Sequence, residues 1–314
     1  MSRIIVRQGI QAVGEGLTSL VLVGKKSALQ VAKFEGKLQE VAQNFVSDSA
    51  QWSSLLSRAP ASGRLPLHFD LANLIAIPDG ASRNNTASNA HSLYRDFKSI
   101  NFSEDVKNVH IILLSDYSDV LPHVAAIART FFKFSLKTSG LRDLQVNIDV
   151  VCEQISSEDT KFLGDLCESI RETARLIDTP ANILTTDALT EEAVNIGTAL
   201  GAKITVIRGD ELLEKGFGGI YHVGKAGPTP PSFVVLTHEV EGSEENIALV
   251  GKGVVYDTGG MQIKTKTGMP NMKRDMGGAA GMLETFAALV KNNFRQTLHA
   301  CLCIVENHVS PIAK

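Results

Sequence analysis

Short apolar runs alternate with longer amphipathic stretches in the first half of this chain, and this rhythm most restricts the folds open to it. Strand-like runs lie at 20–23, 110–114 and 144–151, and helical patterns lie at 27–45 and 120–134. Strands separated by helices favour an α/β fold, because each helix returns the chain across the face of a parallel or mixed sheet. The sequence therefore predicts an N-terminal α/β domain over residues 1–156.

One long helix is expected to connect this domain to the next, over residues 157–178. Ser156-Ser-Glu-Asp159 offers a capped and acidic start, and apolar residues then recur three and four positions apart. Asp178-Thr-Pro180 ends the pattern, because the residue before a proline is driven out of helical geometry.

Residues 179–314 are predicted to form a second α/β domain with a mixed, mostly parallel sheet. Its helices are expected at 188–200 and 277–290, and its strands at 203–207, 233–236, 246–250 and 298–305. Thr186 or Asp187 is the expected cap of the first helix. The strand at 246–250 is expected to be buried and to end in a glycine turn at Gly251-Lys-Gly253.

Composition excludes several classes of function. Lys and Arg number 31 against 34 Asp and Glu, a net charge of -3, so we expect no nucleic-acid partner and no anionic membrane surface. The apolar runs are too short to cross a bilayer, and the N-terminus lacks the apolar core of a secretory signal. None of the four cysteines forms a Cys-x-x-Cys pair, so we expect reduced core cysteines and a cytoplasmic location.

Residues 250–278 carry the densest concentration of chemically useful side chains. Lys252, Asp257, Lys264 and Asp275 all lie there, each close to glycine. Active sites of open α/β sheets gather at the carboxyl ends of strands, and carboxylates are the ligands that hard divalent cations prefer. The helix expected from Gly277 would favour an ionised Asp275. A lysine buried beside cations can ligate as a neutral amine, as Lys252 could, while a charged Lys264 could stabilise an oxyanion.

Simpler interpretations stay open on spacing alone. Gly251-Lys-Gly253 could be a turn with a surface lysine, and Asp275 could be only a helix cap. The sequence has no Walker-type phosphate loop, no Gly-x-Ser-x-Gly elbow and no His-x-x-x-His pair. A nucleotide-like ligand of the N-terminal domain finds no support in a glycine-rich loop within residues 1–156.

Two segments together resemble the two-metal cytosolic leucine aminopeptidase family. They are Val250-Gly-Lys-Gly-Val-Val-Tyr-Asp-Thr-Gly-Gly260 and Lys273-Arg-Asp-Met-Gly-Gly-Ala-Ala280. Upstream, Asp178-Thr-Pro-Ala-Asn182 resembles the family's entry to its catalytic domain, and residues 216–224 and 230–236 match its order of segments. The residues of these motifs look closest to those of the probable aminopeptidase-like branch found in animals. The resemblance covers 178–314 well and the earlier residues loosely. It implies an N-terminal α/β domain followed by the first half of an α/β metallo-aminopeptidase catalytic domain.

The resemblance also implies a role for each candidate residue. Lys252 and Asp275 would bind one metal, Asp257 would bridge two metals, Lys264 would bind the scissile carbonyl, and Met272 would line the substrate pocket. The implied reaction is release of a leucine-like N-terminal amino acid from a peptide by metal-activated water. The implied cofactors are two divalent ions (zinc, manganese or magnesium), and the implied assembly is a cytoplasmic homohexamer.

The chain departs from the family pattern in three respects. Thr258 stands where serine is commoner, and Thr265 stands where proline is common. Nothing matches the family's second motif, Asn-Thr-Asp-Ala-Glu-Gly-Arg, and the spacing of Asp187 and Glu191 does not replace it. We therefore expect a chain that stops before the second motif, carries part of the active site and is inactive alone. The alternative is a catalytically inactive binding or interaction protein derived from the same fold.

Overall fold

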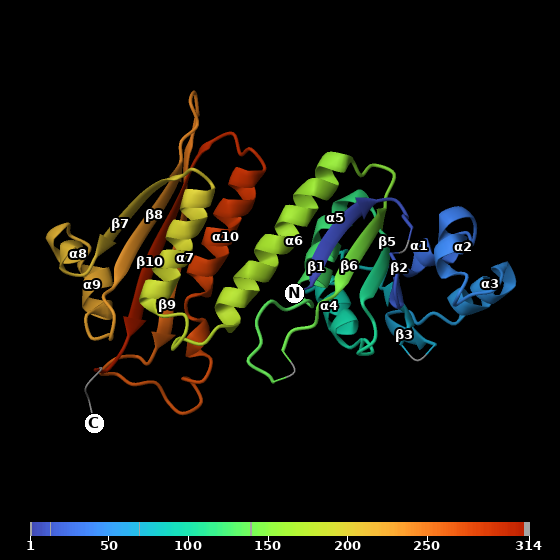
Figure 1. Cartoon of the computed structure of the whole chain (residues 1–314), viewed down its shortest axis with the longest axis horizontal. Helices are drawn as coiled ribbons and strands as arrows, with labels where there is room; N and C mark the ends of the chain where they lie inside the picture. Colours follow the sequence, from blue (N-terminus) through green and yellow to red (C-terminus); the bar gives the residue numbers. More distant parts are fainter. Residues whose placement is uncertain (1, 13, 69, 139, 311–314) are drawn as a thin grey trace. The chain divides into compact units, whose positions relative to one another are not determined.

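The computed structural model describes residues 2–310 apart from residues 13, 69 and 139. The chain divides into two compact units, Met1–Arg171 and Glu172–Lys314 (Figure 1). The division runs inside helix α6 (Ser157–Asp178), the helix expected to connect two domains. The helix therefore contributes residues to both units, and the domain bounds set from the sequence stay a prediction.

The described residues of the first unit form a six-stranded sheet in the order β1-β6-β5-β2-β4-β3. All neighbouring strands are parallel except β3 and β4. The strands are β1 (Arg3–Gln8), β2 (Thr18–Lys25), β3 (Gly63–Leu67), β4 (Ala72–Ile77), β5 (Asn108–Leu114) and β6 (Gln145–Val151). The helices are α1 (Lys26–Val31), α2 (Gly36–Ala42), α3 (Ser49–Ser57), α4 (Ala90–Lys98), α5 (Tyr117–Ala128) and α6.

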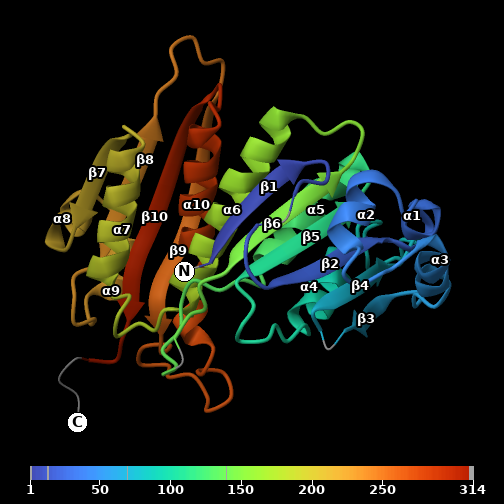
Figure 2. The same ribbon diagram turned by 45° about the vertical axis from the view of Figure 1, so that its right-hand side comes forward.

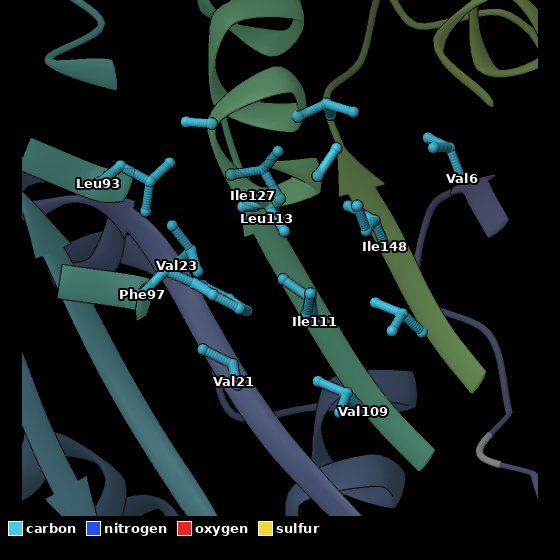
Figure 3. Packing of buried hydrophobic residues seen from close by; sticks show 14 of the residues in the cluster. Val6, Val21, Val23, Leu93, Phe97, Val109, Ile111, Leu113, Ile127 and Ile148 are labelled. Atoms are coloured by element: carbon cyan, nitrogen blue, oxygen red, sulfur yellow. The ribbon is translucent and has the colours of Figure 1, made fainter. Parts of the chain in front are cut away.

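Helices cover both faces of this sheet (Figure 2). Successive side chains of a strand point to opposite faces, so Val21 and Ile111 pack with α4 and α5, while Leu22 and Ile112 pack with α1 to α3. Figure 3 shows the first of these clusters, with Val21 and Ile111 of the strands near Phe97 of α4. Burial on both faces explains the continuous apolar runs in the sequence and confirms the expected α/β class.

Two helical patterns in this unit are shorter than the sequence suggested. The pattern at 27–45 is two helices, because Ala32 and Glu35 are extended and Gly36 has a φ of 58°. Positive φ is open to glycine but not to a continuing right-handed helix. The pattern at 120–134 ends at Ala128, after which Phe131 folds back into the core.

The described residues of the second unit form a four-stranded sheet in the order β7-β8-β10-β9. Its strands are β7 (Lys203–Arg208), β8 (Ser232–His238), β9 (Asn246–Asp257) and β10 (Thr297–Asn307). Its helices are α7 (Thr186–Ala199), α8 (Asp210–Glu214), α9 (Gly218–Gly224) and α10 (Gly277–Lys291), with a 3₁₀ turn η1 (Met272–Arg274). Buried residues of α7 and α10 pack on one face of this sheet, around Phe286 and Leu302.

The sheet is mixed, as expected, but the expectation that it is mostly parallel is wrong for the described strands. Only β9 and β10 are parallel, whereas β7–β8 and β8–β10 are antiparallel. The short helices α8 and α9 lead the chain from Arg208 to its cross-strand partner Ser232 at the same end of the sheet. Only the β9–α10–β10 connection crosses the face, which is what a parallel pair requires.

Three further expectations are corrected. Strand β9 does not turn at Gly251-Lys-Gly253 but continues to Asp257, and its first half is alternately exposed rather than buried. Helix α7 is capped by Thr185, whose hydroxyl accepts a hydrogen bond from Ala188 N, and not by Thr186 or Asp187. The four cysteines are free, as expected, but only Cys167 is buried.

None of the helices in the described part of the chain combines the length and the apolar character needed to cross a membrane.

Candidate active site

The candidate site is built where β9 meets the segment that leads into α10. β9 lies at the edge of the described sheet, and Val254 N on it donates a hydrogen bond of 3.3 Å to the carbonyl of Asp275. Gly251 lets α10 approach, since a Cβ there would lie 2.6 Å from Ala279 Cα. The glycines thus serve close packing and not a turn.

Lys252 and Asp275 form the first ion pair of the site. Lys252 Nζ contacts Asp275 Oδ2, and the two side chains are 59% and 22% exposed. Lys252 points away from the core because Gly251 and Gly253, its neighbours on the strand, face the helix. The pair joins β9 to the turn before α10, and the shared metal expected of these two residues stays a prediction.

Asp257 and Lys264 form the second ion pair, with 3.0 Å between Oδ2 and Nζ. Asp257 Oδ1 also accepts hydrogen bonds from Gly259 N at 2.9 Å and Asn307 Nδ2 at 2.7 Å. Burial alone would raise the pKa of Asp257, but these donors and the Lys264 ammonium outweigh it and lower the pKa to about 2. Asp257 is therefore ionised at neutral pH.

The loop after Asp257 is held in a defined shape. Lys264 N donates to Thr258 O at 2.9 Å, which folds the loop so that the Lys264 side chain returns to Asp257. Gly259 and Gly260 have φ values of 87° and 67°, a region that favours glycine. The Gly-Gly pair therefore takes a backbone conformation that other residues rarely adopt.

Met272 begins the turn η1, three residues before Asp275, and is half-buried. Its N–H donates to Met269 O at 2.8 Å. The turn therefore ties Met272 to the segment that positions Asp275. Its contact with a substrate stays a prediction.

Two residues that contribute to the site were missed from the sequence. Asn307 binds Asp257, and its carbonyl accepts from Thr258 N at 3.0 Å and from Thr258 Oγ1 at 2.8 Å. Lys273 Nζ donates to the carbonyl of Asp178 at 2.6 Å. The position of Asn307 at the carboxyl end of β10, parallel to β9, was the signal that could have found it.

The chemistry of these groups suits a divalent cation only in part. Asp257 and Asp275 offer hard carboxylate oxygens. Within the described residues, no group of three or more His, Cys, Asp or Glu side chains is placed to hold a metal ion. The two carboxylates would need Lys252 as a further ligand, and donors from elsewhere to complete the coordination.

Comparison with protein families gives two matches that together span most of the chain. The model of the cytosol aminopeptidase family, catalytic domain, matches residues 171–314. The model of the M17 aminopeptidase N-terminal domain 2 matches residues 18–140.

Relatives of the chain are named aminopeptidases. It is 72% identical to leucine aminopeptidase 1 of Caenorhabditis elegans, over 100% of this chain and 64% of the relative. It is 39% identical to the human probable aminopeptidase NPEPL1, over 79% of this chain and 49% of the relative. The chain thus spans less than two thirds of the length of either relative.

Solved structures give the same result. A structure of the Caenorhabditis elegans leucine aminopeptidase superposes with a TM-score of 0.96, over 99% of this chain and 64% of that one. A leucyl aminopeptidase from Leishmania major in complex with actinonin superposes with a TM-score of 0.85 at 26% identity, over 99% of this chain and 63% of that one.

Proposed function

Because the chain belongs to the M17 cytosol aminopeptidase family, we propose that it provides one side of the active site of a two-metal aminopeptidase. The substrates are peptides with a free, leucine-like N-terminal residue. The observation that carries the proposal is the pairing of Lys252 with Asp275 and of Lys264 with Asp257, within the region that the catalytic-domain model matches. The names of the relatives support the reaction class.

The metal ligands in this chain are Lys252, Asp257 and Asp275. Their donor set fits part of a site for two divalent ions, with zinc, manganese or magnesium as candidates. When bound, such ions supply an activated water and polarise the substrate carbonyl. Asp257 is kept ionised for this task by Gly259 and Asn307, so it can accept a cation without first losing a proton.

Lys264 is the catalytic residue of this chain. Its ammonium lies 3.0 Å from Asp257 Oδ2, so the two charged groups are next to each other in the site. A fixed cation there stabilises negative charge that develops on a carbonyl oxygen. Met272 contributes an apolar surface for the N-terminal side chain of the peptide, as its place three residues before Asp275 supports.

The described groups form only part of a complete site, since two carboxylates and one amine are too few for two cations. We therefore propose that the 314-residue chain alone hydrolyses little or no substrate. The same proposal includes a homohexamer and a location in the cytosol. The names of bacterial relatives, probable cytosol aminopeptidases, support the location.

A chimaera tests this function directly. In it, the chain is joined to the part of the Caenorhabditis elegans relative that it does not cover; we call it the extended protein. We expect it to release aminomethylcoumarin from leucyl-aminomethylcoumarin when a divalent metal is present, and to leave the N-acetylated compound intact. Failure to hydrolyse the free-amine substrate, or equal hydrolysis of both, would contradict the proposal and favour a binding protein without catalysis.

A further inference from the structure

The carboxyl edge of the N-terminal sheet carries a serine at a position typical of nucleophiles. Ser115 follows β5 directly, and α5 begins two residues later at Tyr117. The nucleophilic serines of α/β-hydrolases lie in this order of strand, serine and helix, and Ser115 shares the order without the glycines of that elbow. β2 and β5 are neighbours, yet α1 and α5 pack on opposite faces, and such a switch point opens a crevice.

A pocket of about 990 Å³ occupies this edge, and Ser115 is part of its lining. Ala28 and Val31 of α1, and Ala32 directly after it, give the pocket an apolar wall, and Val31 is 77% exposed. Asp116 and Glu153 also line it, and among the described residues no lysine, arginine or histidine belongs to the lining. The pocket therefore suits an uncharged or cationic molecule with a small apolar group.

Ser115 is hydrogen-bonded to a buried imidazole. Ser115 Oγ lies 3.0 Å from His123 Nδ1, and His123 Nε2 lies 2.7 Å from the carbonyl of Ser88. A carbonyl only accepts, so Nε2 carries the proton and Nδ1 presents a lone pair to the serine hydroxyl. The hydroxyl also lies 3.1 Å from Asp116 O, so its proton has two acceptors and the imidazole is the basic one.

The surroundings keep this imidazole neutral. His123 is fully buried, and burial lowers its pKa below 6.5, against the opposing effects of Ser88 O and of Asp119 and Asp116. Lys25 Nζ lies 2.6 Å from Asp119 Oδ2 and 2.8 Å from Asp116 Oδ2, and its charge also lowers the pKa. A neutral imidazole is the form that acts as a general base.

We propose that Ser115 is the nucleophile, and His123 the general base, of an acyl-transfer site in the N-terminal unit. Its substrates are uncharged or cationic esters with a short apolar acyl group. Ser115 Oγ bonds to the acyl carbon as the ester C–O bond breaks, and the serine proton passes through His123 Nδ1 to the leaving alkoxide. Water then hydrolyses the acyl-serine and restores the hydroxyl.

The 314-residue chain itself is the material for the test. It is incubated with p-nitrophenyl butyrate and, separately, with an uncharged fluorophosphonate, and the modified residue is located by peptide mass mapping. We expect a single adduct on Ser115, lost in Ser115→Ala and kept in the control Ser103→Ala, which changes an exposed serine of the same unit outside the pocket.

The role of the base is read from two further measurements. His123→Asn should slow labelling about 10²–10⁴-fold, and urea unfolding shows whether this variant stays folded. If the variant unfolds, the pH dependence of labelling in the wild-type chain still tests the role of the base. The rate of labelling at Ser115 should be constant above about pH 7 and fall at lower pH, because His123 gains a proton. Equal labelling of Ser115→Ala, adducts spread over lysines, or a labelling rate that rises steadily with pH would overturn the proposal. None of these outcomes depends on aminopeptidase activity.

Discussion

Asn307 Nδ2 donates a 2.7 Å hydrogen bond to Asp257 Oδ1 and so joins the ends of two parallel strands at the candidate active site. The register of β10 against β9 shifts between Val305 and Asn307, and after the shift Asn307 lies opposite Asp257. Irregularities of this kind re-aim a side chain at the edge of a sheet. Asn307 is therefore a positioning residue, which fixes the carboxylate that the proposed metal ions share.

Replacing Asn307 should weaken metal binding more than folding. We expect Asn307→Ala to lower the metal affinity of the extended protein about 10–100-fold, since Asp257 loses a donor that orients it. Calorimetric titration with Mn²⁺ measures the affinity, and urea unfolding measures stability. A loss of affinity no larger than the loss of stability would show that Asn307 has only a structural role.

The close approach of α10 to β9 predicts opposite outcomes for two glycines. Gly251→Ala should destabilise the chain by about 1–3 kcal/mol, because the new methyl group would meet the backbone of Ala279. Gly281→Ala lies in α10 with nothing within 4 Å of the new methyl group, and it should stabilise by about 0.5–1 kcal/mol. Urea midpoints compare the two variants with the parent. Equal midpoints for both variants would contradict the packing described for β9.

The buried carboxylate of Asp149 predicts an acid limit to the stability of the N-terminal unit. Burial would raise the pKa of Asp149, but hydrogen bonds from His110 at 2.7 Å, from Arg7 at 2.5 Å and from Gln11 N outweigh it and lower the pKa below 3.8. A carboxyl group whose pKa is lower in the folded than in the unfolded chain stabilises the fold. This stability is fully present above the pKa of the unfolded chain and is lost as the pH falls through the pKa of the folded chain.

The corresponding variant is Asp149→Asn. It should cost about 3–5 kcal/mol at neutral pH, because Arg7 and His110 lose the carboxylate between them. The variant should also lose less stability than the parent on acidification below about pH 4. Thermal unfolding at several pH values measures both effects. Parallel pH profiles for parent and variant would exclude Asp149 as a source of the acid dependence.

Metal binding by the 314-residue chain alone should be weak. Two carboxylates and one amine leave each ion short of the four or more ligands that tight sites provide. We expect calorimetry to give a lower affinity for Zn²⁺ than in the extended protein, and a further loss in Asp257→Asn. Tight binding of two zinc ions by the chain alone would show that its own residues complete the site.

Many of the strands and helices could be predicted from the spacing of apolar residues in the sequence. The elements that were predicted wrongly have identifiable physical causes. The strands β5 and β6 were predicted because burial on both faces gives unbroken apolar runs. β9 was cut short at Gly251, since glycine signals a turn in sequence but here admits a helix. The antiparallel pairs of the second sheet were missed because α8 and α9 are too short to produce a helical period.

The part of the candidate site that lies in one continuous stretch of sequence could be predicted. Lys252, Asp257, Lys264 and Asp275 stood out because glycine and charge alternate around them, and the structure joins them into two ion pairs. Asn307 could not be found in this way. It lies 50 residues from Asp257 in sequence, and only the pairing of β10 with β9 brings it to the carboxylate.

The central claim, that Lys264 and Asp257 belong to an aminopeptidase site, is tested most directly by steady-state hydrolysis of leucyl-aminomethylcoumarin. The extended protein is compared with its Lys264→Ala and Asp257→Asn variants, and with Lys266→Ala as a control at an exposed lysine two residues away. We expect kcat/KM to fall about 10²–10³-fold in the first two variants and to stay unchanged in the control. Undiminished activity in Lys264→Ala and Asp257→Asn would contradict the claim.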